Sequence, residues 1–140
     1  MRETLVPGIR HTFRYEVPDD KLVPALYPEA PEFQAMPRVF ASGFLIGLIE
    51  WVCIQAVQPH IDWPREQTVG THFDLSHAAP TPAGCPVEVE VELVEVEKRR
   101  LKFRVSARDD LATISEGTHE RFVVDAERFQ AALGERSGGG

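Results

Sequence analysis

The stretch that decides the fold is residues 39–61, VFASGFLIGLIEWVCIQAVQPHI. Its only Asp, Glu, Lys or Arg side chain is Glu50, and its apolar residues cover every side of a helix rather than one stripe. A helix that is apolar all round is normally buried. Gly43 and Gly47 lie four residues apart on one helical face and allow the backbone of an enclosing sheet to approach closely. We therefore predict one long buried helix wrapped by a sheet.

A membrane span is the competing interpretation of this run, because about 20 apolar residues suffice to cross a bilayer. The carboxylate of Glu50 in mid-helix would be costly in lipid, and the strand patterns that follow bring no basic flank. We therefore expect the helix to lie inside a soluble domain, with no membrane partner.

The segments on both sides of the helix alternate apolar and polar residues, the period of half-buried strands. One such strand precedes the helix and four follow it, at residues 9–17, 67–75, 86–97, 101–107 and 113–124. In the longest of these the alternation shifts phase at Leu93 and Val94, and only one extra residue there keeps Glu95 and Glu97 facing outward. We predict a β-bulge at this point.

Residues 18–38, between the first strand and the helix, are termed the lid. The five prolines of the lid permit only short helical turns. Apolar residues such as Leu22, Leu26 and Phe33 are interspersed among them. Long loops with their own apolar anchors are often functional, so the pattern indicates a cover over a pocket.

An antiparallel sheet wrapped around one long central helix is the hotdog architecture. The predicted fold class is therefore α+β, with one domain over residues 1–134. A short helix is expected over residues 126–133, followed by a flexible Gly-rich tail at residues 135–140. One face of so small a sheet, together with its edges, usually needs a second copy to complete the core, so we expect a homodimer.

The charge balance disfavours some partners. The 140 residues carry 15 Lys and Arg against 22 Asp and Glu, a net charge of −7, which argues against a dedicated nucleic-acid binder. Five of the acidic side chains belong to the exposed face of residues 86–97, so part of this charge is a solvated stripe. An anionic ligand would need a local basic patch, for which Lys98, Arg99 and Arg100 are the candidates.

Several kinds of site are missing from the sequence. The two cysteines, Cys53 and Cys85, are too few for a disulfide framework and indicate a reducing compartment. Neither they nor the five histidines have metal-ligand spacing, so we expect no metal. A Gly-rich phosphate loop, a dinucleotide fingerprint and an export signal are also lacking. We expect a cytoplasmic protein without a nucleotide cofactor.

Glu50 is the most informative residue, because its neighbours one helical turn away, Ile46, Gly47, Cys53 and Ile54, cannot pair with a carboxylate. A buried carboxylate without partners is costly, so donors from another strand or subunit are expected. Two interpretations stay open. Glu50 is either a functional carboxylate or a structural one that pairs with an arginine or a buried amide.

Three other side chains, Ser42, His77 and Arg121, are candidates beside Glu50. Ser42 lies eight residues earlier, about 80° round the helix and two turns along it, so the two could line one cleft; a serine near a helix start is also a common cap. His77 ends a strand, where it is a candidate acid–base partner or an ordinary solvated histidine. Alternation sends His119 and Arg121 to one face of the last strand, where Arg121 suits a carbonyl or phosphate and is equally compatible with a surface role.

Several motifs carry a resemblance: YPEAPEF at residues 27–33, VFASGF at 39–44, HAAPTP at 77–82 and GTHER at 117–121. In this order, over most of residues 5–130, the chain resembles the fluoroacetyl-CoA thioesterase family of hotdog hydrolases. The resemblance implies hydrolysis of a short-chain acyl-CoA thioester, of fluoroacetyl-CoA or a related small polar acyl group, to a carboxylate and CoA. CoA is then part of the substrate rather than a cofactor.

The resemblance also implies roles for individual positions. Ser42, Glu50 and His77 match the hydroxyl, glutamate and histidine of the family's catalytic set, although the enzyme that names the family has threonine where Ser42 stands. Gly70 matches a backbone position near the thioester carbonyl or the attacking water. Arg121 matches an arginine near the active site.

Two phenylalanines of the lid close the family's acyl pocket. Phe33 matches one of them, whereas Met36 stands at the other position, and a flexible thioether makes a less rigid gate than an aromatic ring. Whether Glu50 attacks the carbonyl or activates water stays open. A non-catalytic acyl-CoA or small-ligand binding protein on the same fold is the alternative function.

Overall fold

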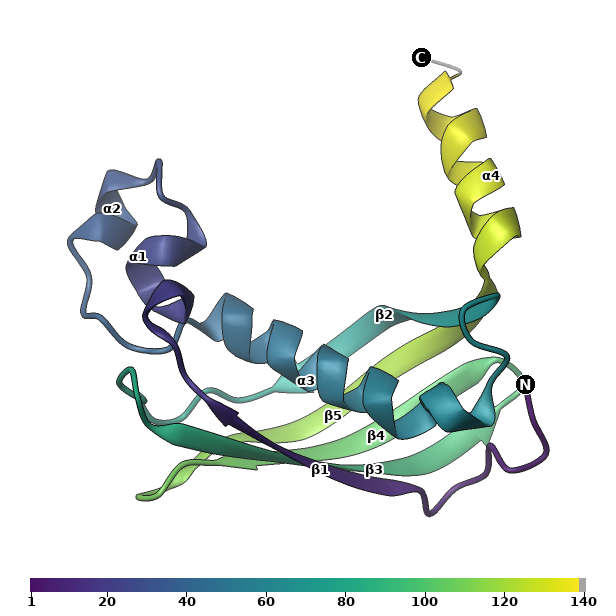
Figure 1. Cartoon of the computed structure of the whole chain (residues 1–140), viewed down its shortest axis with the longest axis horizontal. Coiled ribbons are helices and arrows are strands. Elements are labelled where there is room, and N and C mark those ends of the chain that lie inside the picture. The colour runs from purple at the N-terminus through teal and green to yellow at the C-terminus, as the bar shows by residue number, and fades with distance from the viewer. Residues whose placement is uncertain (139–140) are drawn as a thin grey trace.

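The computed structural model describes residues 1–138 and shows a curved five-stranded antiparallel sheet with helix α3 across its concave face (Figure 1). The strand order is β1-β3-β4-β5-β2, so β1 and β2 form the two edges. The predicted α+β hotdog architecture is confirmed. The elements in chain order are β1 (Arg10–Glu16), η1 (Asp19–Lys21), α1 (Val23–Leu26), α2 (Pro31–Gln34), α3 (Ser42–Val57), η2 (Gln58–His60), β2 (Glu66–Leu75), β3 (Pro86–Glu97), β4 (Arg100–Arg108), β5 (Thr113–Asp125) and α4 (Ala126–Gly138).

Each predicted strand is present, and its ends fall within one residue of the predicted ones. The predicted bulge is confirmed, because the register between β3 and β4 shifts between Leu93 and Glu95. A second shift, between Gly70 and His72 of β2, was not predicted. The apolar pattern of β2 shows no phase break there, so the sequence carries no signal for it.

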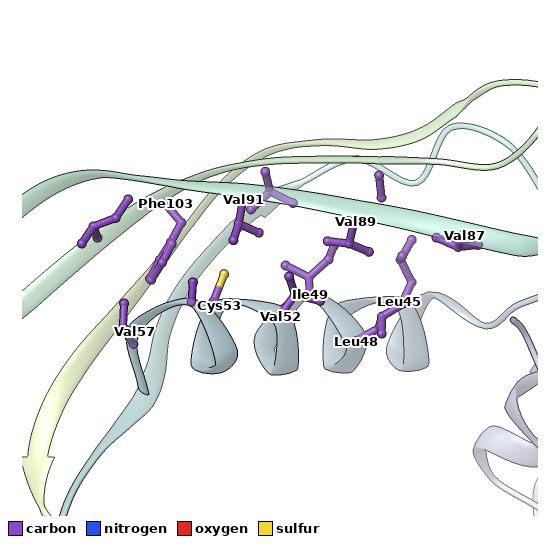
Figure 2. Close-up of a cluster of buried hydrophobic side chains, with 14 of the residues drawn as sticks. Leu45, Leu48, Ile49, Val52, Cys53, Val57, Val87, Val89, Val91 and Phe103 are labelled. Carbon is purple, nitrogen blue, oxygen red and sulfur yellow. The ribbon is translucent and has the colours of Figure 1, made fainter. Parts of the chain in front are cut away.

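The core lies between α3 and the sheet (Figure 2). Val87, Val89 and Val91 of β3 all face the helix and are fully buried, because alternate residues of a strand share one side. Leu45 and Ile49 meet them from α3. Each fully buried aliphatic side chain contributes roughly 1.5–3 kcal/mol, so this contact fixes the helix on the sheet.

The sheet encloses α3 on one side only, which corrects the prediction that the helix is buried all round. On its remaining faces Trp51 is 47% exposed, and Ile46 and Ile54 are only half-buried. By length and composition alone, residues Ser42–His60 would suffice to cross a membrane. Here they pack on the sheet as a core helix does, and an apolar flank is left for a further contact.

The lid consists of two one-turn helices, α1 and α2, placed at the start of α3 (Figure 1), as the proline spacing predicts. The two ends of the lid are joined, because the Val23 N–H donates to the Val39 carbonyl at 2.9 Å. Inside the lid, the Gln34 side chain donates to the Pro24 carbonyl at 2.8 Å and ties α2 to α1. The lid is thus a self-contained unit attached to the body at its base.

Helix α4 is longer than predicted. It continues to Gly138 instead of ending at residue 133, so residues 135–138 of the expected flexible tail are helical, while residues 139–140 lie outside the described part of the chain. Asp125 caps the helix by accepting the Arg128 N–H at 3.0 Å. Good helix formers such as Ala, Glu, Arg and Leu outweigh the glycine at position 134. The helix rises at the end of the sheet away from the lid (Figure 1).

Candidate active site

Glu50 lies in the middle of α3, on the flank next to β2 and β5. Its Oε1 accepts a hydrogen bond from Nη1 of Arg121, on β5, at 2.9 Å. The Arg121 side chain is 3% exposed and that of Glu50 is 35% exposed. Within residues 1–138 the second carboxylate oxygen, Oε2, makes no hydrogen bond. One oxygen is thus held as in a structural carboxylate, and the other is left for a reactant.

Arg121 is buried and fully engaged, so the surface interpretation of this residue was wrong. Its Nε donates to Thr68 Oγ1 and its Nη2 to the Thr68 carbonyl, both at 2.8 Å. These bonds cross from β5 to the neighbouring strand β2 and fix the plane of the guanidinium. A buried arginine keeps its charge and needs such partners, so it presents a fixed positive group to Glu50.

Gly70 packs directly against the Glu50 carboxylate. A Cβ added at Gly70 would lie 2.6 Å from Glu50 Oε1 and 3.0 Å from Phe73 Cζ. Only glycine fits this position without displacing the carboxylate. The β2 bulge follows immediately, between Gly70 and His72. Glu50, Gly70 and Arg121, all predicted site residues, are therefore neighbours, and we term them the glutamate half-site.

His119 completes this cluster, and sequence reasoning gave it no role. The side chain is fully buried, its Nδ1 lies 2.8 Å from the His72 carbonyl, and its Nε2 lies 3.1 Å from Arg121 Nη1. Burial lowers the pKa of His119 below its usual value of 6.5, so the ring is neutral at pH 7. The sequence signal for this residue was its position two residues before Arg121 on the same strand, which places both side chains on one face.

Ser42 and His77 form a second pair, which we term the serine half-site. Ser42 Oγ lies 2.6 Å from His77 Nδ1. The segment around His77 is fixed because the N–H groups of Ser76 and Ala78 both donate to β5 carbonyls. Burial lowers the pKa of His77, and its Nε2 is buried without a hydrogen-bond partner in residues 1–138. A neutral His77 can therefore accept the Ser42 proton.

Ser42 is also the first residue of α3. The N-cap residue, Ala41, offers no side-chain hydrogen bond to the helix start. The first N–H groups of a helix have no partner inside it, and the helix dipole adds positive potential there. The serine half-site thus combines a hydroxyl, a neutral imidazole and backbone donors suited to an oxyanion.

The two half-sites do not meet within one chain. Ser42 and Glu50 are eight residues apart on a continuous helix, which separates them by about 12 Å along its axis. A thioester carbonyl held at Ser42 is out of reach of Glu50 of the same chain. The expectation that both side chains line one cleft is therefore not met by a single chain.

The lid lies over the serine half-site. A Cβ added at Gly43 would come 2.9 Å from Leu26 Cδ1, so α1 rests on the backbone of α3 beside Ser42. Phe33 stacks on Tyr27 with ring centroids 5.9 Å apart. Met36 is 46% exposed. Of the predicted lid residues, Phe33 thus packs inside the lid, whereas Met36 lies at its outer surface.

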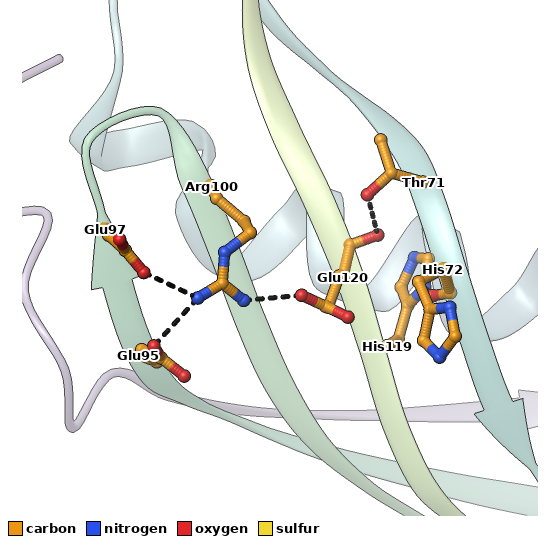
Figure 3. A network of polar contacts seen from close by, with 7 residues as sticks. All are labelled: Thr71, His72, Glu95, Glu97, Arg100, His119 and Glu120. Atoms are coloured by element: carbon orange, nitrogen blue, oxygen red, sulfur yellow. Dashed lines mark hydrogen bonds and ion pairs between the residues drawn. The ribbon is translucent and has the colours of Figure 1, made fainter.

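Of the predicted basic patch, Arg100 is already occupied. It pairs with Glu95 at 2.8 Å, with Glu97 at 2.9 Å and with Glu120 (Figure 3). Of the two turn residues before it, Lys98 is exposed and Arg99 is 51% exposed. Any contact with an anionic ligand from this turn therefore comes from Lys98 and Arg99.

Cys53 is a further potentially reactive side chain near the glutamate half-site. Burial raises the pKa of the Cys53 thiol, which leaves it protonated and a poor nucleophile. In the described residues no three His, Cys, Asp or Glu side chains gather as metal ligands would. Glu50 and the serine half-site are the candidate reactive groups that the geometry brings forward.

Comparisons with known proteins show the family to which this chain is related. Residues 27–127 match the model of a family described as fluoroacetyl-CoA-specific thioesterase. The chain is 44% identical to the fluoroacetyl-CoA thioesterase of Streptantibioticus cattleyicolor over 140 residues, which cover 100% of both chains.

Solved structures are similar over nearly the whole chain. A threonine-to-serine variant of a fluoroacetyl-CoA thioesterase, in complex with acetyl-CoA, is 46% identical with a TM-score of 0.91, covering 94% of this chain and 98% of that one. A thioesterase-superfamily member from Thermus thermophilus, 20% identical with a TM-score of 0.83 and 99% of each chain covered, shares the fold. With its family match and its identity to a known member, this chain belongs to the family of fluoroacetyl-CoA-specific thioesterases.

Proposed function

We propose that this chain acts in the cytoplasm as a homodimer that hydrolyses a short, polar acyl-CoA thioester to its carboxylate and CoA. The observation that carries this function is Glu50, a carboxylate on an otherwise apolar helix, fixed at Oε1 by the buried Arg121. CoA enters as part of the substrate, and we propose no separate cofactor.

A second copy of the chain brings the two half-sites together. Ile46 stands midway between Ser42 and Glu50 on α3. If two α3 helices lie side by side and antiparallel about a two-fold axis at the level of Ile46, Ser42 of one copy lies beside Glu50 of the other. Contacts about a two-fold axis are reciprocal, so the dimer has two identical sites.

The surface of the single chain supports this arrangement. The outer edge of β2 has no strand partner within residues 1–138, and residues 70–74 on it are exposed. An unpaired edge strand is a ready template for a second chain. The half-buried Ile46 and Ile54 lie on the same flank of α3 and supply an apolar contact. These features also explain why α3 is apolar on faces that the sheet does not cover.

In the proposed site, the thioester carbonyl oxygen accepts hydrogen bonds from N–H groups at the start of α3. Such donors act where negative charge develops, and removal of one donor costs about 3–4 kcal/mol in other enzymes. Glu50 of the partner subunit then faces the carbonyl carbon. Its Oε2 either attacks this carbon, forming a mixed anhydride that water hydrolyses, or removes a proton from the attacking water.

The C–S bond breaks when the tetrahedral intermediate collapses, and the thiolate of CoA leaves. The thiolate takes up one proton of the water that is consumed, which Glu50 removes in the base route and which is released when water opens the anhydride in the other route. Ser42 and His77, in contact at 2.6 Å, orient the carbonyl and relay this proton. Arg121 keeps the Glu50 carboxylate aimed through its 2.9 Å contact with Oε1.

Release of free thiol from a panel of acetyl-, fluoroacetyl- and longer acyl-CoAs tests this function. We expect two-carbon acyl groups to be hydrolysed fastest. Glu50→Gln should lower kcat by on the order of 10⁴-fold, although its amide oxygen keeps the Arg121 contact. Glu90→Gln, on an exposed strand position, is the matched control and should retain the wild-type rate.

Full activity of Glu50→Gln would overturn the assignment of Glu50. A wild-type protein that binds acyl-CoA and releases no thiol would instead favour the non-catalytic binding protein, in which the Glu50–Arg121 pair is purely structural.

A further inference from the structure

Both ring nitrogens of His119 are in use, although the proposed mechanism does not use this residue. The His72 carbonyl can only accept, so His119 Nδ1 carries the proton that it donates across 2.8 Å. Nε2 is then an acceptor, and it receives Arg121 Nη1 at 3.1 Å. His119 and His72 come from the neighbouring strands β5 and β2 (Figure 3).

Arg121 Nη1 is thereby shared between two acceptors. It donates to Glu50 Oε1 at 2.9 Å and to His119 Nε2 at 3.1 Å. The other donors of the guanidinium go to Thr68 and fix its plane from one side. Because the guanidinium is rigid, the acceptor that His119 offers to Nη1 fixes the plane from the other side, next to the carboxylate.

The same ring also holds the β2 bulge. It stacks on Phe73 with centroids 4.3 Å apart and an interplanar angle of 20°. A Cβ added at Gly70 would lie 3.3 Å from its Cε1. The ring thus contacts the bulge backbone, Gly70 and Arg121 at once.

We infer that His119 is a positioning residue of this thioesterase site, holding the Arg121 guanidinium so that Glu50 is aimed at the substrate carbonyl. This role rests on the proposed function of Glu50. His119 does not touch the substrate; it acts through Arg121.

Two substitutions separate the contribution of the hydrogen-bond acceptor of His119 from the contribution of its aromatic ring. His119→Phe keeps the ring and its stacking on Phe73 but removes both hydrogen bonds, whereas His119→Gln keeps an acceptor near the Nε2 position. We expect His119→Phe to lower kcat by on the order of 100-fold, the cost of misplacing a reacting group by about 1 Å, with KM changed less than about threefold. His119→Gln should regain most of the lost kcat.

The control is His60→Phe, because His60 lies at the far end of α3 and contacts Thr4. It should leave kcat and KM at wild-type values. A wild-type kcat in His119→Phe, or equal losses in His119→Phe and His119→Gln, would overturn the positioning role.

A second readout does not depend on turnover. Rotation of the Arg121 guanidinium, followed by ¹⁵N NMR of arginine-labelled protein, should be faster in His119→Phe than in the wild type and His119→Gln, although Thr68 and Glu50 still hold the guanidinium. Equal rotation rates in all three proteins contradict the inference. Absence of thiol release by the wild type would overturn the proposed function alone, because this measurement still reports on His119.

Discussion

The glutamate half-site and the serine half-site are built in opposite ways. In the first, Arg121 is buried and bonded to Glu50, Thr68 and His119, and Gly70 packs against Oε1 of the carboxylate. In the second, Ser42 is exposed and makes one side-chain contact, to His77, beside the lid helix α1. The glutamate half-site is therefore preorganised by its own chain, whereas the serine half-site is more open.

This difference predicts where substitutions change stability and where they change activity alone. A preorganised charge stabilises a transition state without reorganising during the reaction. This suits Glu50, which is proposed to attack the carbonyl carbon or to activate water. An open half-site admits the substrate.

Among the residues that support Glu50 and Ser42, the largest effect is expected for Arg121→Gln. It should lower kcat by on the order of 10³-fold, because Glu50 loses its fixed partner. It should also lower the free energy of unfolding by about 2 kcal/mol, less than for a fully buried pair because Glu50 is 35% exposed. Ser42→Ala should change stability by less than about 0.5 kcal/mol. Urea denaturation of both variants checks the contrast, and equal stability losses would contradict it.

Three glycine substitutions grade the rigidity of the two half-sites. Gly70→Ala puts a methyl group 2.6 Å from Glu50 Oε1 and should lower kcat by on the order of 100-fold. Gly43→Ala meets only the flexible end of Leu26 and should cost a few-fold in kcat. At Gly47 an added Cβ meets nothing within 4 Å, so Gly47→Ala is the control and should stabilise the helix by about 0.5–1 kcal/mol. A Gly43→Ala effect larger than that of Gly70→Ala would reverse the comparison.

The pH dependence of kcat/KM should reveal the serine half-site. Burial lowers the pKa of His77 below its usual 6.5, so the neutral form persists below that pH. We expect kcat/KM to stay level from pH 7.5 to 6.5 and to fall only at lower pH. An acid limb centred at or above 6.5 contradicts this.

The free energy of unfolding should also decrease as the pH is lowered. The pKa values of His77 and His119 are both lowered by burial, so the unfolded chain binds protons that the folded chain does not. Their contribution to the free energy of unfolding is fully present above pH 6.5 and is lost as the pH falls below it. Urea denaturation at pH 7.5 and 5.5 measures the loss, which should be smaller in His119→Phe.

The smallest effect is expected at the lid. Met36→Phe replaces an exposed, flexible side chain by a rigid ring and should raise the preference for fluoroacetyl-CoA over acetyl-CoA by a few-fold. Rates with the two substrates, measured beside the wild type, give the ratio. An unchanged ratio would show that Met36 does not set selectivity.

Much of the fold was predictable because the apolar run, the strand alternation and the proline spacing all indicated the same architecture. One apolar run with a single carboxylate defined α3, and a phase shift in residues 86–97 located the bulge at Leu93. The β2 bulge leaves no such mark, since Gly70, Thr71 and His72 interrupt no apolar alternation. The full length of α4 was missed because glycines and serine near its end suggested a tail.

The candidate site was predictable in its members but not in its arrangement. Glu50 and Arg121 were both candidates, yet only the packing of α3 against β5 shows that they meet. Arg100 forms an ion pair with Glu120, which lies on a third strand, and the local sequence around Arg100 does not indicate this pair. The separation of Ser42 from Glu50 follows from their spacing of eight residues on α3, and the proposed dimer is what would bring them together.

The central claim is that each active site combines Ser42 and His77 of one copy with Glu50 of the other. A heterodimer of one His77→Ala chain and one Glu50→Gln chain, isolated through two different affinity tags, tests it most directly. One site then carries both substitutions and the other carries neither, so about half of the wild-type activity should return. Activity no higher than that of the two parent homodimers would contradict the shared site.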